Sequence, residues 1–164
     1  MNEEKISKNK INYRRANIDD IDILVNFRIR FLNEFYKHPE DNEAEILKKE
    51  LKEYFSKAIP SGDFIAWLAE YNGKVIGTSG MVIWQMPPKY GLKSGRLGYI
   101  LNMYTIPEVR KKGICTQLLN KLIKEAKSLG LTYLHLHPSE DGINIYRKAG
   151  FVKPGRIELE LRLE

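Results

Sequence analysis

The most informative stretch of this chain reads RLGYILNMYTIPEVRKKGICTQLL and covers residues 96–119. Its first ten residues are almost all apolar, which predicts a strand buried in the middle of a sheet. From Ile114 to Leu129 apolar residues recur at helical spacing, and Gly130 follows as a helix stop. We therefore expect a buried strand that leads into an amphipathic helix covering the sheet.

A short basic turn joins this strand to this helix. Arg110, Lys111 and Lys112 are consecutive cations, and Gly113 stands at the mouth of the helix. The first N–H groups of a helix have no partner inside it, so they can bind an anion with the help of the helix dipole. The turn lacks the residues of a Walker loop and of a dinucleotide fingerprint. The sequence thus indicates a phosphate site, with a solvated basic turn as the alternative.

The rest of the chain alternates strands and helices. A type I′ turn at Asn72-Gly73 predicts a β-hairpin, and Asn17 followed by Asp20 predicts a capped helix that runs to about Tyr36. Further helices are expected over Ala44–Lys57 and roughly 142–149. The expected strands cover 11–16, 64–71, 74–84, 96–105, 131–137 and a last strand in which Ile157, Leu159 and Leu161 alternate with charged residues.

Composition predicts one globular domain over residues 1–164, with residues 1–10 as a flexible tail. The chain is 43% hydrophobic and 29% charged, an ordinary globular mixture. The longest uncharged run, Val75–Pro88, is too short for a membrane span of about 18 residues and contains two prolines. The first residues are polar and unlike a secretory signal, so we expect a cytoplasmic protein without membrane partners.

Cysteine content and charge restrict the chemistry further. Cys115 is the single cysteine and there are three histidines, so an intramolecular disulfide and a multi-thiolate zinc site are excluded and no metal is expected. The net charge of +6 suits nucleic acid, an anionic membrane or a phosphorylated small molecule. Because aromatic residues are not interleaved with a basic strand face, we expect no nucleic-acid partner.

The strand LNMYT, the pair Ile106-Pro107 and the turn RKKGIC resemble the acetyl-CoA signature V-x-P-x-x-R/Q-x-x-G-x-G/A of the GNAT acyltransferase superfamily. The segment LHLHPSEDGINIYRKAGF, residues 134–151, resembles the second half of that family. Two positions differ, because Thr105 stands where Val is usual and Cys115 replaces the second Gly or Ala. The resemblance implies an α/β, GNAT-like fold. Its mixed, mostly antiparallel central sheet would have about six to seven strands, one splayed parallel pair and about four flanking helices.

The resemblance also implies an activity and a set of site residues. The chain would be an N-acetyltransferase that transfers the acetyl group of acetyl-CoA to a primary amine of a small molecule or peptide by direct attack. Tyr146 would be the general acid for the leaving sulfur. The residues implied in cofactor binding belong to the strand end, the basic turn and the loop after the second parallel strand: Met103, Tyr104, Thr105, Arg110, Lys111, Lys112, Gly113, Ile114, Cys115, Thr116 and Ser139.

Several alternatives stay open at the level of sequence. A non-catalytic acyl-CoA-binding regulatory module would keep the phosphate turn without the chemistry. The base that deprotonates the amine is not singled out, and the candidates are Glu34, Glu70, His135, His137 and water. Cys115 is interpreted as a packing residue, and a homodimer is a candidate assembly. The acceptor site is expected between the first two helices and the loop at 86–96, near Arg28, Arg30, Tyr36, Trp84 and Tyr90.

Overall fold

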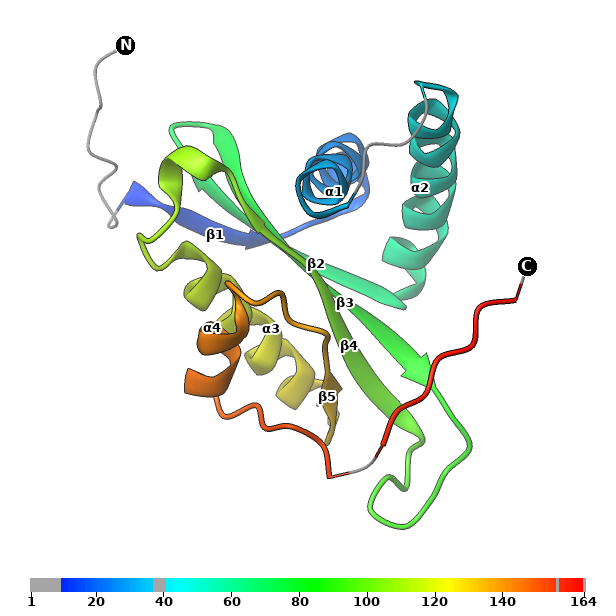
Figure 1. Ribbon diagram of the computed structural model, residues 1–164. Helices are drawn as coiled ribbons and strands as arrows, with labels where there is room; N and C mark the ends of the chain where they lie inside the picture. Colours follow the sequence, from blue (N-terminus) through cyan, green and yellow to red (C-terminus); the bar gives the residue numbers. More distant parts are fainter. Residues whose placement is uncertain (1–9, 37–40, 156, 164) are drawn as a thin grey trace.

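A computed structural model describes residues 10–36, 41–155 and 157–163 (Figure 1). The flexible tail predicted for residues 1–10 therefore lies, apart from Lys10, outside the described residues. The described residues form one five-stranded sheet in the order β1-β2-β3-β4-β5. Neighbouring strands are antiparallel except for the parallel pair of β4 and β5. The strands are β1 (Asn12–Arg15), β2 (Phe64–Tyr71), β3 (Lys74–Gln85), β4 (Arg96–Thr105) and β5 (Leu134–His135).

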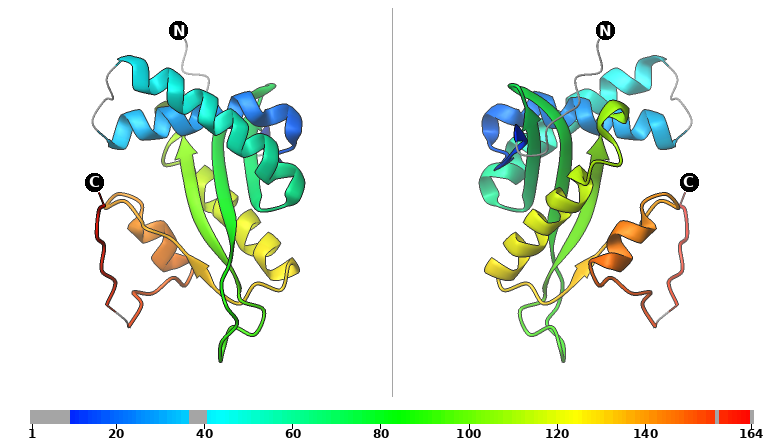
Figure 2. Two further views of the ribbon diagram at one scale, coloured as in Figure 1. Left: turned by 90° about the vertical axis from the view of Figure 1, so that its right-hand side faces the viewer. Right: turned by 90° about the vertical axis from the view of Figure 1, so that its left-hand side faces the viewer.

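Two pairs of helices cover the two faces of the sheet, as Figures 1 and 2 show. On one face lie α1 (Ile21–Phe35) and α2 (Asp41–Ser61), and on the other lie α3 (Ile114–Ser128) and α4 (Ile143–Lys148). Short 3-10 turns cover Ile18–Asp20 and Pro107–Val109. In the described part of the chain, none of the helices combines the length and hydropathy of a membrane-spanning segment.

Alternating residues of the sheet supply both hydrophobic cores. Phe64 and Leu68 of β2 pack with buried residues of α1 and α2, whereas Ile65 packs with Leu119 and Leu122 of α3. This alternation is the period-2 pattern of a strand that is covered on both faces. The central strands are therefore held rigidly, which gives the end of β4 a fixed position.

Several local signals in the sequence are confirmed. Asn17 and Asp20 form a capping box in which the Asn17 side chain also accepts from the Asp19 N–H. Asn72 and Gly73 both have positive φ, as a type I′ turn requires. The helix predicted over 44–57 is longer, since α2 covers Asp41–Ser61. Burial of Ala58 against α1 and the sheet favours the added C-terminal turn.

The prediction of about six to seven strands is wrong for the described residues, because the sheet has five. The strand expected over 131–137 is reduced to Leu134–His135, and the expected last strand is absent from the described C-terminal residues. There Ile157, Leu159 and Leu161 are 82–91% exposed. The alternation of apolar and charged residues predicts which side chains share one face of a strand. A strand forms only where its N–H and C=O groups pair with those of a neighbouring strand, and these described C-terminal residues have no such pairing.

Strands β4 and β5 separate soon after they meet, as the left view of Figure 2 shows. Their register pairs only Gly98 with Leu134 and Tyr99 with His135. A Cβ at Gly98 would lie 2.6 Å from Met81 Sδ and 2.7 Å from a Leu134 methyl, so this contact requires glycine. Beyond Tyr99, β4 has no strand partner on that side among the described residues.

A bulge in β4 lies within this unpaired length. The register with β3 shifts between Thr78 and Gly80, opposite Asn102, whose φ is 53°. Leu101 packs with the core under α1 and α2, and Asn102 bonds to a side chain of α1, so two consecutive residues face the same side. Met103 then packs toward α3. The bulge thus redirects β4 just where β5 leaves it.

Candidate active site

The basic turn after β4 has the backbone of an anion-binding loop. Lys111 and Gly113 adopt left-handed conformations with φ of 60° and 84°. The first backbone bond of α3 runs from the Gln117 N–H to the Gly113 carbonyl at 3.1 Å. The N–H groups of Ile114, Cys115 and Thr116 therefore have no partner within the helix and lie at its positive end. Successive N–H groups in such a turn form a concave site for a phosphate oxygen.

The side chains of this turn divide into exposed cations and a buried anchor. Lys111 is exposed, and Lys112 Nζ lies 3.5 Å from the Glu108 carbonyl. Ile114 is 2% exposed and packs in the core, so it could reach a ligand only through its backbone. A Cβ at Gly113 would meet nothing within 4 Å, which leaves the mouth of α3 open.

Arg110 is directed toward α1 rather than into the turn. Its Nη1 and Nη2 lie 2.6 and 2.7 Å from the two carboxylate oxygens of Glu34, and its Nε donates to the Thr105 carbonyl at 3.1 Å. The guanidinium also lies over the Tyr104 ring, 5.4 Å from its centroid. The hydrogen bond from Arg110 holds the pKa of Glu34 below its usual value. Arg110 thus ties the end of α1 to the turn.

The end of β4 presents an open backbone edge next to this turn. Met103 packs toward α3, Tyr104 packs edge-to-face on Phe27, and Thr105 is buried. The side chains are therefore held in the cores, while the strand edge beyond Tyr99 has no neighbour among the described residues. A peptide-like chain could bind such an edge as an added strand would.

Tyr146 and Cys115 lie close enough to interact between α4 and the start of α3. Burial raises the pKa of Tyr146 to about 12, with a smaller contribution from Cys115. The Tyr146 hydroxyl is therefore protonated at neutral pH, as a proton donor must be. Burial also raises the pKa of Cys115, whose Sγ lies 3.8 Å from Thr105 Oγ1. A thiol in this state is a poor nucleophile, which agrees with a packing role.

Ser139 has a structural partner at the start of α4. Its Oγ accepts a hydrogen bond from the Gly142 N–H at 3.2 Å, and its carbonyl accepts from Ile143. In the predicted contact of Ser139 with a cofactor, the Ser139 hydroxyl would therefore bind the cofactor while its oxygen still accepts the hydrogen bond at the start of α4. A Cβ at Gly142 would lie 3.5 Å from the Tyr146 ring, so this turn borders the candidate acid.

The structure separates the four candidate bases. Glu34 is paired with Arg110, and Glu70 accepts from Arg14 Nε at 2.8 Å on the far side of the sheet. His137 lies just after β5, with Nδ1 2.7 Å from the Tyr99 hydroxyl and Nε2 3.6 Å from Glu158. His135 and His137 are thus the two candidates at the separation of β4 and β5, since His135 pairs with Tyr99 at the end of the ladder and His137 follows β5.

Three residues of this region did not emerge from the sequence as a group. Arg28 of α1 donates to the Asn102 side-chain oxygen at 2.8 Å, and burial raises the pKa of Tyr99 while the Arg28 charge opposes that shift. The two bonded residues are 74 positions apart in the chain. The one available signal was Asn102 itself, a polar residue inside an almost wholly apolar strand.

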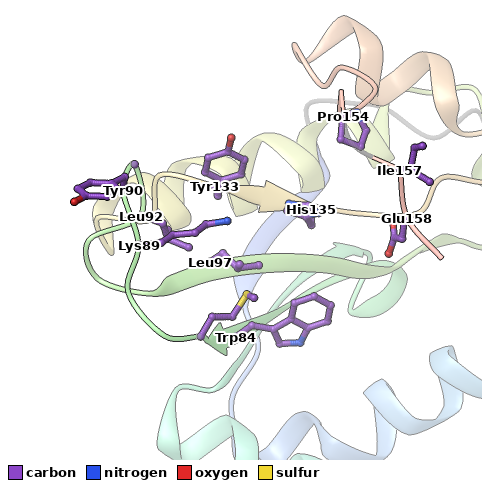
Figure 3. A pocket seen from close by; sticks show the side chains of 12 residues that line it. Trp84, Lys89, Tyr90, Leu92, Leu97, Tyr133, His135, Pro154, Ile157 and Glu158 are labelled. Atoms are coloured by element: carbon purple, nitrogen blue, oxygen red, sulfur yellow. The ribbon is translucent and has the colours of Figure 1, made fainter. Parts of the chain in front are cut away.

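A cavity of about 380 Å³ lies beside β4 and β5, at the end of the sheet that carries the loop at 86–96 (Figure 3). The loop after β3 lines one end of it, the C-terminal segment lines the other, and Leu97 and His135 lie between them. At its base Trp84 stacks on Tyr99, with the ring centroids 4.5 Å apart. The loop at 86–96 thus closes a space that includes Trp84 and Tyr90 of the predicted acceptor region, whereas Arg28, Arg30 and Tyr36 of that region do not line it.

Comparison with known proteins accounts for the open edge and the anion-binding turn together. Residues 28–151 match the model of the acetyltransferase (GNAT) family. The chain belongs to this family. A predicted acetyltransferase from Clostridium acetobutylicum, solved with acetyl-CoA, is 37% identical over 93% of this chain and 96% of that chain, with a TM-score of 0.84. That relative thus shares the fold and nearly the whole length of this chain.

Two other relatives are more distant. The uncharacterized N-acetyltransferase YjgM of Escherichia coli (strain K12) is 25% identical over 107 residues, which are 59% of this chain and 60% of that protein. The chain therefore matches about three fifths of the length of that relative. A GCN5-related N-acetyltransferase from Ralstonia eutropha JMP134 is 22% identical over 92% of this chain and 98% of that chain, with a TM-score of 0.79. The last likeness concerns the GNAT fold alone.

Proposed function

We propose that the protein is an acetyl-CoA-dependent N-acetyltransferase that acts on a primary amine of a small molecule or peptide. The observation that carries the proposal is the unpaired edge of β4 leading directly into the open N-terminus of α3. The 37% identical relative solved with acetyl-CoA supports the same cofactor here. The described residues contain no cluster of three or more metal-ligating side chains. The cytoplasmic location stays a prediction from sequence.

Two parts of acetyl-CoA correspond to two parts of the site. The N–H groups of Ile114, Cys115 and Thr116, with Lys111 and Lys112 nearby, would bind the pyrophosphate. The backbone from Met103 to Thr105 would pair with the amide-rich pantetheine arm. Arg110 would act indirectly, because its ion pair with Glu34 holds the turn against α1.

The proposed chemistry needs one proton donor and one proton acceptor. Acetyl-CoA supplies a thioester whose acyl carbon a neutral amine can attack directly. Tyr146 would donate its proton to the sulfur as the carbon–sulfur bond breaks, since its raised pKa of about 12 keeps it protonated. His137, through the Tyr99 hydroxyl 2.7 Å away, would accept the proton that the amine loses. A backbone N–H at the β4 bulge would stabilise the charge on the carbonyl oxygen.

A thiol-release assay with acetyl-CoA and a panel of amines, amino acids and polyamines tests the function. We expect release of free CoA that depends on an acceptor, and mass spectrometry should find the acetylated acceptor. Acetyl-CoA that stabilises the protein without acceptor-dependent release would instead support the non-catalytic acyl-CoA-binding module. Loss of release in a His137→Gln variant at pH 7, with recovery at high pH, would assign the base.

We also propose that two copies form a dimer through the C-terminal segment. Ile157, Leu159, Leu161 and Leu163 are 82–91% exposed, and their alternation places them on one face of an extended chain. The outer edge of β5 has no strand neighbour among the described residues, so the segment of a second copy could pair there. The homodimer would thus cover apolar side chains that one chain leaves in water.

A double variant, Leu159→Glu with Leu161→Glu, is expected to separate the two copies. Light scattering of the parent should give twice the 19.1 kDa of one chain. Burying each leucine stabilises by about 1.5–3 kcal/mol, so the variant should weaken dimerisation by roughly 100-fold or more. Glu160→Gln, on the opposite face of the segment, is the matched control and should stay dimeric. A monomeric parent at micromolar concentration would contradict the proposal.

A further inference from the structure

Arg28 is a half-buried cation held by a neutral partner. It extends from α1, donates from Nη1 to Asn102 Oδ1 at 2.8 Å, and lies 5.5 Å from the centroid of the Phe31 ring. Asn102 is 7% exposed and adopts its positive φ at the bulge of β4. The contact therefore joins a fixed position on α1 to the strand that leads into the cofactor turn.

No carboxylate pairs with Arg28 among the described residues, whereas Arg14, Arg15 and Arg110 are each in an ion pair. Burial lowers the pKa of Arg28, which shows that its charge is partly removed from water. A guanidinium has five N–H donors, and a single amide oxygen satisfies only a small part of them. A desolvated charge without a counter-charge is costly, so this arrangement suits a protein that receives an anion from a ligand.

The position of Arg28 points to the acceptor rather than to the cofactor. Burial lowers the pKa of Arg28, Tyr36 and Tyr99 oppose that shift, and the Tyr99 hydroxyl lies 2.7 Å from His137. These groups lie on the α1 face, whereas Met103 and Tyr146 pack with α3. The bulge at Asn102 is therefore the point where a ligand on the α1 face would come near the acyl group on the β4 edge.

We propose that Arg28 binds an anionic group, a carboxylate or a phosphate, on the amine acceptor. This inference rests on the proposed N-acetyltransferase function and names the class of its substrate: amines that also carry an anion, such as amino acids or amino phosphates. The planar guanidinium suits both groups because it can donate two parallel hydrogen bonds to either. Asn102 would be a positioning residue that holds the Arg28 guanidinium in place.

Matched acceptors test the proposal by thiol release at saturating acetyl-CoA. Standard amino acids are compared with their primary amides, and phosphoethanolamine is compared with ethanolamine. In one of the two series the anionic member should have a kcat/KM about 100-fold higher than its neutral counterpart, since two charge-assisted hydrogen bonds are at stake. The series that shows the difference distinguishes carboxylate from phosphate.

The Arg28→Gln variant should remove this preference. The ratio of kcat/KM for the anionic acceptor to kcat/KM for its neutral counterpart should fall about 100-fold, through a higher KM for the anionic acceptor. Arg28→Lys should keep part of the preference for the anionic acceptor, because lysine has the positive charge but lacks the planar guanidinium that donates two parallel hydrogen bonds. Arg30→Gln removes an exposed arginine of the same helix and tests whether the effect is specific to position 28, so an equal loss of preference in this variant would contradict the proposal.

The outcomes separate this proposal from the proposed function. Neutral amines that react as well as their anionic partners would overturn the role of Arg28 and leave the N-acetyltransferase function intact. If no acceptor releases thiol, the function fails, and thermal melts of the acetyl-CoA-saturated protein with the same compounds decide the anion site. If an anionic compound raises the Tm of the parent but not of Arg28→Gln, the result would support the anion site. If no anionic compound raises the Tm of the parent, the result would overturn the anion site.

Discussion

Replacing Gly113 with glutamate is expected to abolish acetyl-CoA binding while the fold survives. The new carboxylate would stand at the mouth of α3, where the N–H groups of Ile114 to Thr116 are free for a pyrophosphate. In the parent, acetyl-CoA at about 100 times its dissociation constant should stabilise the protein by about 2.7 kcal/mol. For a domain of this size that corresponds to a rise in Tm of roughly 5–10 °C. The variant should show no rise.

Gly130→Glu is the matched control for this experiment. Gly113 and Gly130 both have positive φ, and a Cβ at either position would meet nothing within 4 Å. The two variants should therefore carry a similar backbone strain of about 1–3 kcal/mol, but Gly130 lies at the opposite end of α3. Gly130→Glu should keep the stabilisation by acetyl-CoA. An undiminished Tm rise in Gly113→Glu would place the phosphate site elsewhere.

Replacing Tyr146 with phenylalanine is expected to lower kcat by roughly 100-fold, the low end of the range for general acid catalysis. The ring should keep its edge-to-face contact with Phe151, so packing changes little. A CoA thiolate with a pKa near about 8.5 leaves fairly well unaided, which limits the loss. The KM for acetyl-CoA should stay constant, because the lost interaction is made in the transition state. Steady-state kinetics with an acceptor from the panel measure both values.

The pH profile and a second tyrosine give independent checks on Tyr146. Because burial raises its pKa to about 12, the acid stays protonated, and kcat of the parent should show no loss from its ionisation below about pH 11. Tyr54→Phe removes the hydroxyl of a more exposed tyrosine, on α2, and should leave kcat unchanged. An unaltered kcat in Tyr146→Phe, with chemistry shown to limit the rate, would reduce Tyr146 to a packing residue.

The elements that depend on neighbouring residues could be predicted from the sequence. Asn17 capping the first helix, the Asn72-Gly73 turn and the start of α3 after Gly113 all follow from side chains within four positions of one another. The basic turn was predictable for the same reason, because a helix N-terminus binds anions through its own backbone. Local chemistry therefore located the candidate cofactor site before any fold was known.

The candidate acceptor site depends on contacts that no local pattern encodes. Arg28 meets Asn102 across 74 residues, and Arg110 meets Glu34 across 76, and the sequence indicated neither contact. The C-terminal residues 157–163 have the alternating apolar and charged pattern of a strand. They form none, because no strand among the described residues pairs with them. Helix caps and turns are stabilised by neighbours in sequence, whereas pairing and charge compensation depend on which segments packing brings together.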